Sequence, residues 1–181
     1  MAPSLALTTA ALTDQDGRAV SLADFAGKTV IFSAFFSSCP SVCPRQTQAL
    51  SQVQQQLSPS LKQRVQFVSL SVDPENDTPD AMRKFALANG ADLNGWSFVR
   101  ASADTTRVLT QELAAFAAPS KSTEPTGHTT AVYLFDGSKR LMQRYGGSPL
   151  DVSRLVHEVE QLDLWFQKKN KPELVEVTTL K

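Results

Sequence analysis

The stretch of sequence that decides the fold is Thr29-Val-Ile-Phe-Ser-Ala-Phe-Phe36, which runs on into Ser37-Ser-Cys-Pro-Ser-Val-Cys-Pro44. The first part is continuously apolar and rich in β-branched and aromatic residues, as is typical of a strand buried on both faces. Serines and prolines then end the strand, and an apolar stripe predicts a helix from about residue 42 to residue 57. Cys39 and Cys43 therefore lie where a buried strand passes into a helix.

Strand and helix signals alternate along the rest of the chain. Strands are predicted at residues 5–13, 18–22, 65–72, 96–99, 130–135 and 140–145, and helices at residues 79–89, 104–116 and 148–167. Parallel strands joined by helices, followed by a hairpin and a last helix, predict an α/β fold. We expect a thioredoxin-like three-layer sandwich with an N-terminal β-hairpin extension. Residues 1–167 form its single domain, and residues 168–181 form a polar C-terminal tail.

Composition excludes several classes of function. The 181 residues include 18 Lys and Arg against 18 Asp and Glu, so the net charge gives no electrostatic case for binding nucleic acid or an anionic membrane. No uncharged run reaches the ~20 residues of a membrane-spanning helix. Residues 1–13 also lack the basic and apolar regions of a signal peptide. We expect contact with a membrane only through an anchor that is absent from this chain.

Cys39 and Cys43 are the only cysteines. A helix N-terminus stabilises a thiolate, and a four-residue spacing places two helical side chains on one face. Such a pair can bind one soft metal ion or close a small-ring disulfide. The extra residue relative to C-x-x-C favours a metal over rapid dithiol exchange. The alternative is a pair of buried, inert cysteines, because free cysteine is among the most buried residue types.

The number of available ligands narrows the choice of metal. Structural zinc and iron–sulfur clusters normally take four protein ligands, whereas Cu(I) is satisfied by two sulfurs and one added imidazole gives a set that holds Cu(II). His128 stands in a loop that enters the predicted strand at residues 130–135, and in a thioredoxin-like fold this loop faces the cysteine turn. His157 lies off the apolar stripe of the last helix, so we expect it at the surface.

The acidic loop of Asp73, Glu75 and Asp77 has a structural interpretation. We expect Asp77 or Thr78 to cap the helix that follows, with Asp77 the more favoured of the two. Asp73 follows a central strand, where it can lie near the cysteines. Trp96 and Phe116 are expected to pack in the core or at its rim.

Three motifs together resemble the Sco/SenC family. Residues 35–44 are similar to its F-x-T-x-C-P-D-V-C-P signature, residues 69–79 are similar to S-V-D-P-E-R-D-T-P, and His128 matches its single ligand histidine. The resemblance implies a thioredoxin-like fold and copper handling for the binuclear copper site of cytochrome c oxidase. Cys39, Cys43 and His128 would be ligands of Cu(I) or Cu(II), and the oxidase subunit that carries the copper site would be the partner. The family faces the bacterial periplasm or the mitochondrial intermembrane space.

Two positions depart from the family pattern, and one other function stays open. Ser41 and Gly127 stand where the family usually or often has Asp, which removes carboxylates beside the expected site. The alternative function is a thiol–disulfide oxidoreductase that uses Cys39 and Cys43 as its catalytic redox pair. Its substrate would be an oxidase subunit or another envelope protein. A thiol peroxidase is disfavoured, because the second cysteine lies so close.

Overall fold

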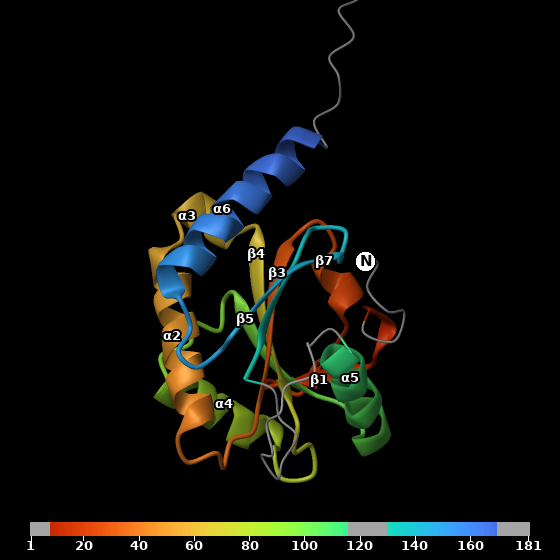
Figure 1. Cartoon of the computed structure of the whole chain (residues 1–181). Helices are drawn as coiled ribbons and strands as arrows, with labels where there is room; N and C mark the ends of the chain where they lie inside the picture. The colour runs from red at the N-terminus through yellow and green to blue at the C-terminus, as the bar shows by residue number, and fades with distance from the viewer. Residues whose placement is uncertain (1–7, 116–129, 170–181) are drawn as a thin grey trace, which may run out of the picture.

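A seven-stranded sheet forms the centre of the computed structural model, which describes residues 8–115 and 130–169 (Figure 1). Its strands are β1 (Leu12–Asp14), β2 (Ala19–Val20), β3 (Thr29–Phe35), β4 (Val65–Ser71), β5 (Trp96–Arg100), β6 (Val132–Phe135) and β7 (Leu141–Tyr145). Their order is β2-β1-β5-β4-β3-β6-β7, with β3, β4 and β5 parallel and the outer strands antiparallel to their neighbours. The expected ligand His128, the neighbouring Gly127, Phe116 and residues 170–181 lie outside the described residues.

Helices cover both faces of the sheet. One face carries α2 (Val42–Gln56), α3 (Pro59–Lys62), α4 (Pro79–Ala88) and α6 (Val152–Lys169), and the other carries α5 (Ala103–Ala115) and the 3-10 helix η1 (Leu22–Phe25), as Figure 1 shows. The β1–β2 hairpin extends the sheet by pairing β1 with β5. The predicted thioredoxin-like three-layer sandwich with an N-terminal hairpin is thereby confirmed.

The buried strand β3 explains why both faces need helices. Ile31 and Phe35 pack on the side of α2, α4 and α6, whereas Val30 and Phe32 pack on the side of α5. All four side chains are at most 2% exposed. Successive residues of a strand point to opposite faces, so a continuously apolar run requires a hydrophobic layer on each side of the sheet.

Helix boundaries differ from the prediction mainly at α6. This helix begins at Val152 rather than near Pro149, because Asp151 accepts a hydrogen bond at 3.0 Å from the Arg154 backbone N–H and so caps its first turn. It also runs to Lys169, two residues beyond the predicted end at Gln167. The short helices η1 and α3 were not predicted, since neither is long enough to show a hydrophobic period.

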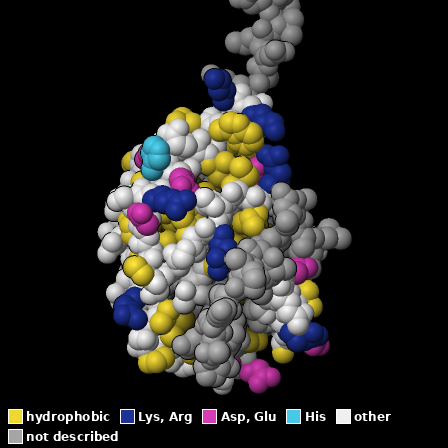
Figure 2. Space-filling view, viewed as in Figure 1, with side chains coloured by type: hydrophobic (Ala, Val, Ile, Leu, Met, Phe, Trp, Pro, Cys, Tyr) yellow, Lys and Arg dark blue, Asp and Glu magenta, His cyan; other side chains and the backbone are white. Residues whose placement is uncertain are grey.

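The described surface is mixed in charge. On the face in Figure 2, Lys and Arg side chains occur together with Asp and Glu side chains and with scattered hydrophobic ones. This distribution agrees with the equal numbers of basic and acidic residues. Within residues 8–115 and 130–169, no helix combines the length and hydrophobicity needed to cross a membrane.

Candidate functional site

The cysteines lie at the carboxyl ends of the parallel strands. Helix α2 begins at Val42 with Ser41 as its N-cap residue, so Cys43 is in the first turn of the helix and Cys39 lies in the turn before it. The expectation that both cysteines share one helical face is therefore wrong for Cys39. Loops that follow adjacent parallel strands meet at one edge of the sheet, which is the usual place of a ligand site in an α/β fold.

Cys39 and Cys43 are brought together because the turn folds back onto the helix. The Cys43 backbone N–H donates a hydrogen bond to the Cys39 sulfur at 3.3 Å. Both cysteines are free. The side chain of Ser41 makes no capping hydrogen bond, so the Cys39 sulfur takes the acceptor role that a capping oxygen usually has.

The two thiols differ in acidity. Burial raises the pKa of Cys39, but hydrogen bonds from the Cys43 side chain and from the backbone of Cys43, Ser41 and Val42 outweigh burial, and the net pKa is lowered. Burial raises the pKa of Cys43 to about 12, helped by the hydrogen bond to Cys39 and opposed by a backbone hydrogen bond from Phe36. Cys39, with the lowered pKa, is thus the partly exposed cysteine, and Cys43, with the raised pKa, is the buried one.

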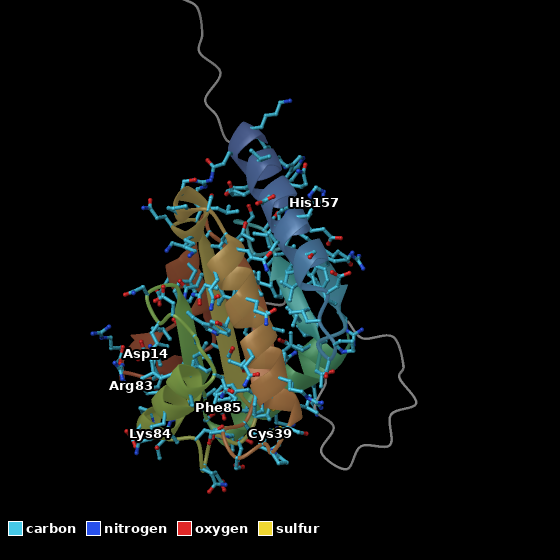
Figure 3. All side chains as sticks on the ribbon, turned by 90° about the vertical axis from the view of Figure 1, so that its left-hand side faces the viewer. Asp14, Cys39, Arg83, Lys84, Phe85 and His157 are labelled. Atoms are coloured by element: carbon cyan, nitrogen blue, oxygen red, sulfur yellow. The ribbon has the colours of Figure 1, made fainter. Side chains whose placement is uncertain are left out.

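The surroundings of the sulfurs are apolar. Cys43 belongs to the same buried cluster as Phe35 and Phe85, and Cys39 and Phe36 pack against this cluster. Figure 3 shows Cys39 near the N-terminal end of α2, close to Phe85 of α4. A hydrophobic environment with two sulfurs suits a soft metal ion more than a hard one.

Asp77 does not cap α4, although it was the favoured candidate. The cap is Thr78, whose Oγ1 accepts the Ala81 N–H at 3.2 Å. Asp77 is instead 1% exposed and accepts hydrogen bonds from Ser37 and Ser71. Asp77 prefers these donors because they lie at the ends of β3 and β4, directly beside it in the fold but distant in sequence.

Thr130, just before β6, is anchored on the helix that carries Cys43. Gln46, in the second turn of α2, donates a 2.5 Å hydrogen bond from Nε2 to the carbonyl of Thr130. Gly147 packs against the same Thr130 carbonyl, since a Cβ on Gly147 would lie 1.4 Å from the carbonyl oxygen. The structure thus places Thr130, two residues after His128, against the helix of Cys43.

The other candidate residues have positions or hydrogen-bond partners of their own. His157 is exposed on α6 and lies far from Cys39 in Figure 3, which confirms its expected surface position. Asp73 accepts two 3.0 Å hydrogen bonds from Asn76, and Trp96 is buried with its indole N–H bonded to Ser69. In the described part of the chain, no group of three or more His, Cys, Asp or Glu side chains is placed to hold a metal ion.

Three residues around the site were missed by the sequence analysis. Gln46 carried a signal, because a glutamine three residues after Cys43 on the inner side of a helix must find a hydrogen-bond partner when buried. Ser37 and Ser71 carried another signal, since polar residues that end neighbouring parallel strands meet at the same edge of a sheet. Neither signal identifies the hydrogen-bond partner of these residues, because the partner depends on the tertiary structure.

A protein-family model described as SCO1/SenC matches residues 8–162 of the chain. A SCO1 protein homolog of Bacillus subtilis (strain 168) is 26% identical over 136 residues, which are 74% of this chain and 70% of the relative. The mitochondrial SCO2 homolog of Homo sapiens is 42% identical over 76 residues, but these are 41% of this chain and only 28% of the human protein.

Solved structures of SCO1/SenC proteins have the same fold as this chain. A SCO1/SenC family lipoprotein from Bacillus anthracis str. Ames superposes with a TM-score of 0.70 and is 26% identical, over 84% of this chain and 91% of that one. ScoI of Bradyrhizobium japonicum, a structure with copper bound, superposes with a TM-score of 0.68 at 24% identity, over 84% of this chain and 96% of that one. At this level of identity the second likeness shows the fold alone.

Proposed function

This chain belongs to the SCO1/SenC family, and from that premise we propose that it is a copper chaperone. Cys39 and Cys43 would hold Cu(I), and His128 would complete a site for Cu(II). The copper is cargo to be delivered, and the recipient would be the subunit that carries the binuclear copper site of cytochrome c oxidase. The copper-bound relative supports this choice of metal.

The observation that carries the proposal is the hydrogen bond from the Cys43 N–H to the Cys39 sulfur, which brings two free cysteines together at the start of α2. Two cysteines already held together at one helix start need little rearrangement to bind one ion, so little ordering entropy opposes binding. Two thiolates satisfy Cu(I), whereas zinc normally takes four protein ligands. The helix N-terminus stabilises negative charge on Cys39, which favours the thiolate that a metal requires.

His128 is proposed as the third ligand on the strength of chain connectivity. The Thr130 carbonyl is bonded to Gln46, one helical turn beyond Cys43. Two residues of chain span at most about 7 Å. A histidine two positions before Thr130 is therefore within reach of this end of α2, and its imidazole is the ligand type that Cu(II) adds to two thiolates.

An anaerobic copper titration tests the proposal. The reduced protein should bind one Cu(I) per chain, and the disulfide form should bind none, because the sulfurs are then no longer thiolates. The double variant Cys39→Ser, Cys43→Ser should lose Cu(I) binding. Equal copper retention by the double variant would contradict the proposal.

The histidine needs its own comparison. His128→Ala should keep Cu(I) through the two sulfurs but lose the thiolate-to-copper charge-transfer band that Cu(II) gives in the visible spectrum. His157→Ala is the matched control, because it removes an exposed imidazole remote from the cysteines. If the two variants retain the same Cu(II) spectrum, His128 is not a ligand.

We also propose that the protein works on the extracytoplasmic side of a membrane, in the bacterial periplasm or its equivalent. The Bacillus anthracis relative is described as a lipoprotein, which supports an anchored form in this family. The test is to fuse the gene, with its native upstream sequence, to alkaline phosphatase, which folds only outside the cytoplasm. An inactive fusion that is nevertheless stably produced would contradict this location.

The asymmetry of the two thiols favours a second candidate function, thiol–disulfide exchange. The thiolate of Cys39 would attack a client disulfide, form a mixed disulfide and release one client thiolate. Cys43 would then lose its proton and attack the Cys39 sulfur, which closes the Cys39–Cys43 disulfide and releases the second client thiolate. The client gains the two electrons that the pair loses. This exchange should survive in His128→Ala, whereas Cu(II) binding should not.

A further inference from the structure

Asp77 bridges the ends of two central strands beneath the cysteine turn. Its buried carboxyl group accepts hydrogen bonds from the Ser71 hydroxyl at 2.5 Å and from the Ser37 backbone N–H at 3.1 Å, and the Ser37 hydroxyl also donates to it. Ser71 is the last residue of β4, and Ser37 lies two residues before Cys39. One side chain therefore ties the turn that carries Cys39 to the sheet.

The backbone at Asp77 is itself held in place. Its N–H donates to the Asp73 carbonyl at 2.9 Å, and the next residue, Thr78, caps α4 through its hydroxyl. Asp77 is thus fixed between a closed loop and a helix start. Its carboxyl group is a firm point of attachment for Ser37.

Much of the cysteine turn is exposed, and within it the Cys39 N–H donates a hydrogen bond to the Phe36 carbonyl at 3.1 Å. Ser38, Pro40 and Ser41 are exposed, and the Ser41 side chain forms no cap. The position of Cys43 is set by α2, but Cys39 lies outside that helix. Whatever holds the turn at Ser37 therefore contributes directly to the separation between the two sulfurs.

From these contacts we propose that Asp77 is a positioning residue of the cysteine site. Acting through Ser37, it holds Cys39 in the place from which both sulfurs bind one metal ion. The inference rests on the proposed copper function and adds to it a residue that touches neither sulfur nor metal. Residues that orient metal ligands typically change metal affinity by about 10- to 100-fold when they are replaced.

Asp136 provides a matched control for the loss of a buried carboxyl group. It is fully buried and accepts hydrogen bonds from the backbone of Ser138 and Arg140. It follows β6, whose residue Phe135 pairs with Val30 near the start of β3, so Asp136 lies at the edge of the sheet opposite to the cysteines. Replacing it should disturb the fold without loosening the cysteine turn.

The experiment compares Asp77→Asn, Ser37→Ala and Asp136→Asn in the full chain. Cu(I) affinity is measured by competition with a chromophoric chelator, and the melting temperature is recorded for each variant. We expect Asp77→Asn to weaken Cu(I) binding about tenfold or more and Ser37→Ala to weaken it less. Asp136→Asn should lower the melting temperature but leave Cu(I) affinity unchanged. An affinity loss in Asp77→Asn no larger than in Asp136→Asn would overturn the inference.

A copper-free readout separates this inference from the proposed function. The Cys39–Cys43 pair is equilibrated with reduced and oxidised dithiothreitol, and its equilibrium constant is measured. If wild type binds no Cu(I), the copper proposal fails, and this constant alone decides the role of Asp77. A shift of several-fold in Asp77→Asn, with none in Asp136→Asn, supports positioning, whereas no shift overturns it. If Asp77→Asn fails to fold, Ser37→Ala takes its place in both measurements, since it removes only one hydroxyl.

Discussion

Gln46 donates a hydrogen bond to the Thr130 carbonyl at 2.5 Å, and this contact joins the helix of Cys43 to the strand that follows His128. The two residues are 84 positions apart in the sequence. Gln46 is only 3% exposed, so its amide has little access to water and depends on this partner. The contact brings Thr130, two residues after the proposed histidine ligand, to the helix of the buried cysteine.

Replacing Gln46 with Ala should weaken the binding of Cu(II) but not the binding of Cu(I). The loss of the hydrogen bond to Thr130 should destabilise the fold by about 1 kcal/mol and weaken Cu(II) binding, while Cu(I) stays bound to the two sulfurs. Visible spectra during Cu(II) titration measure the effect. Gln54→Ala is the control, because Gln54 is also buried on α2 but bonds to the backbone of Asp92 instead. Equal Cu(II) affinity in the two variants would argue against a link between Gln46 and His128.

Neighbouring glycines should respond very differently to the same substitution. In Gly147→Ala the new Cβ would lie 1.4 Å from the Thr130 oxygen and 2.1 Å from Gln46 Nε2, whereas at Gly146 it would meet nothing within 4 Å. Gly147→Ala should therefore destabilise the protein by about 3 kcal/mol, because backbone must move to admit the methyl group. Gly146→Ala should be nearly neutral. Urea denaturation of the two variants measures the difference, and equal midpoints would contradict the close packing at Gly147.

The alkylation rate of the metal-free protein should report the unequal acidity of the thiols. Hydrogen bonds outweigh burial and lower the pKa of Cys39, whereas burial raises the pKa of Cys43 to about 12. Because the thiolate is the nucleophile, iodoacetamide should modify Cys39 first, with a rate that rises at a lower pH than for an ordinary thiol. Mass spectrometry of peptides after short exposure identifies the modified residue. Preferential labelling of Cys43 would refute the assignment.

A buried lysine should leave a signature in the pH dependence of stability. Lys139 is 6% exposed and donates hydrogen bonds to the carbonyls of Phe25 and Lys28. Burial lowers its pKa to about 8 from a usual value of 10.5, although the charge of Asp136 opposes the shift. Between pH 8 and pH 10.5 this lysine is protonated to a greater extent in the unfolded chain than in the folded one. The free energy of unfolding therefore increases as the pH rises through this range.

The variant Lys139→Met isolates this effect. The free energy of unfolding of wild type relative to Lys139→Met should rise from about pH 8 to about pH 10.5 and be constant below pH 8. Urea denaturation at a series of pH values measures the difference between the two proteins, in which the other titrating groups cancel. A difference that stays flat or falls across this range would contradict the lowered pKa.

The residues around the cysteine turn show which features the sequence predicts and which it does not. The apolar run before Cys39 predicts β3 correctly, and the proline and apolar stripe after it predict α2 to within one residue. The same reading placed Cys39 on the face of a helix and Asp77 at a helix cap, and both were wrong. Helix caps and turns are decided by which donors and acceptors lie nearby, and several alternatives fit the same local sequence.

The order of residues along the chain was sufficient to predict the central strands, the main helices and a pair of cysteines at one helix start, because hydrophobic period and residue spacing are properties of neighbours in sequence. The first strand was predicted at residues 5–13, but β1 covers only Leu12–Asp14, and residues 8–9 are helical. The tertiary structure alone decided that Asp77 holds Ser37, 40 positions away, and that Gln46 holds Thr130, 84 positions away. Such contacts depend on strand order and on how the helices pack against the sheet. A buried polar group bonds to whatever the fold brings beside it, and no local pattern specifies that partner.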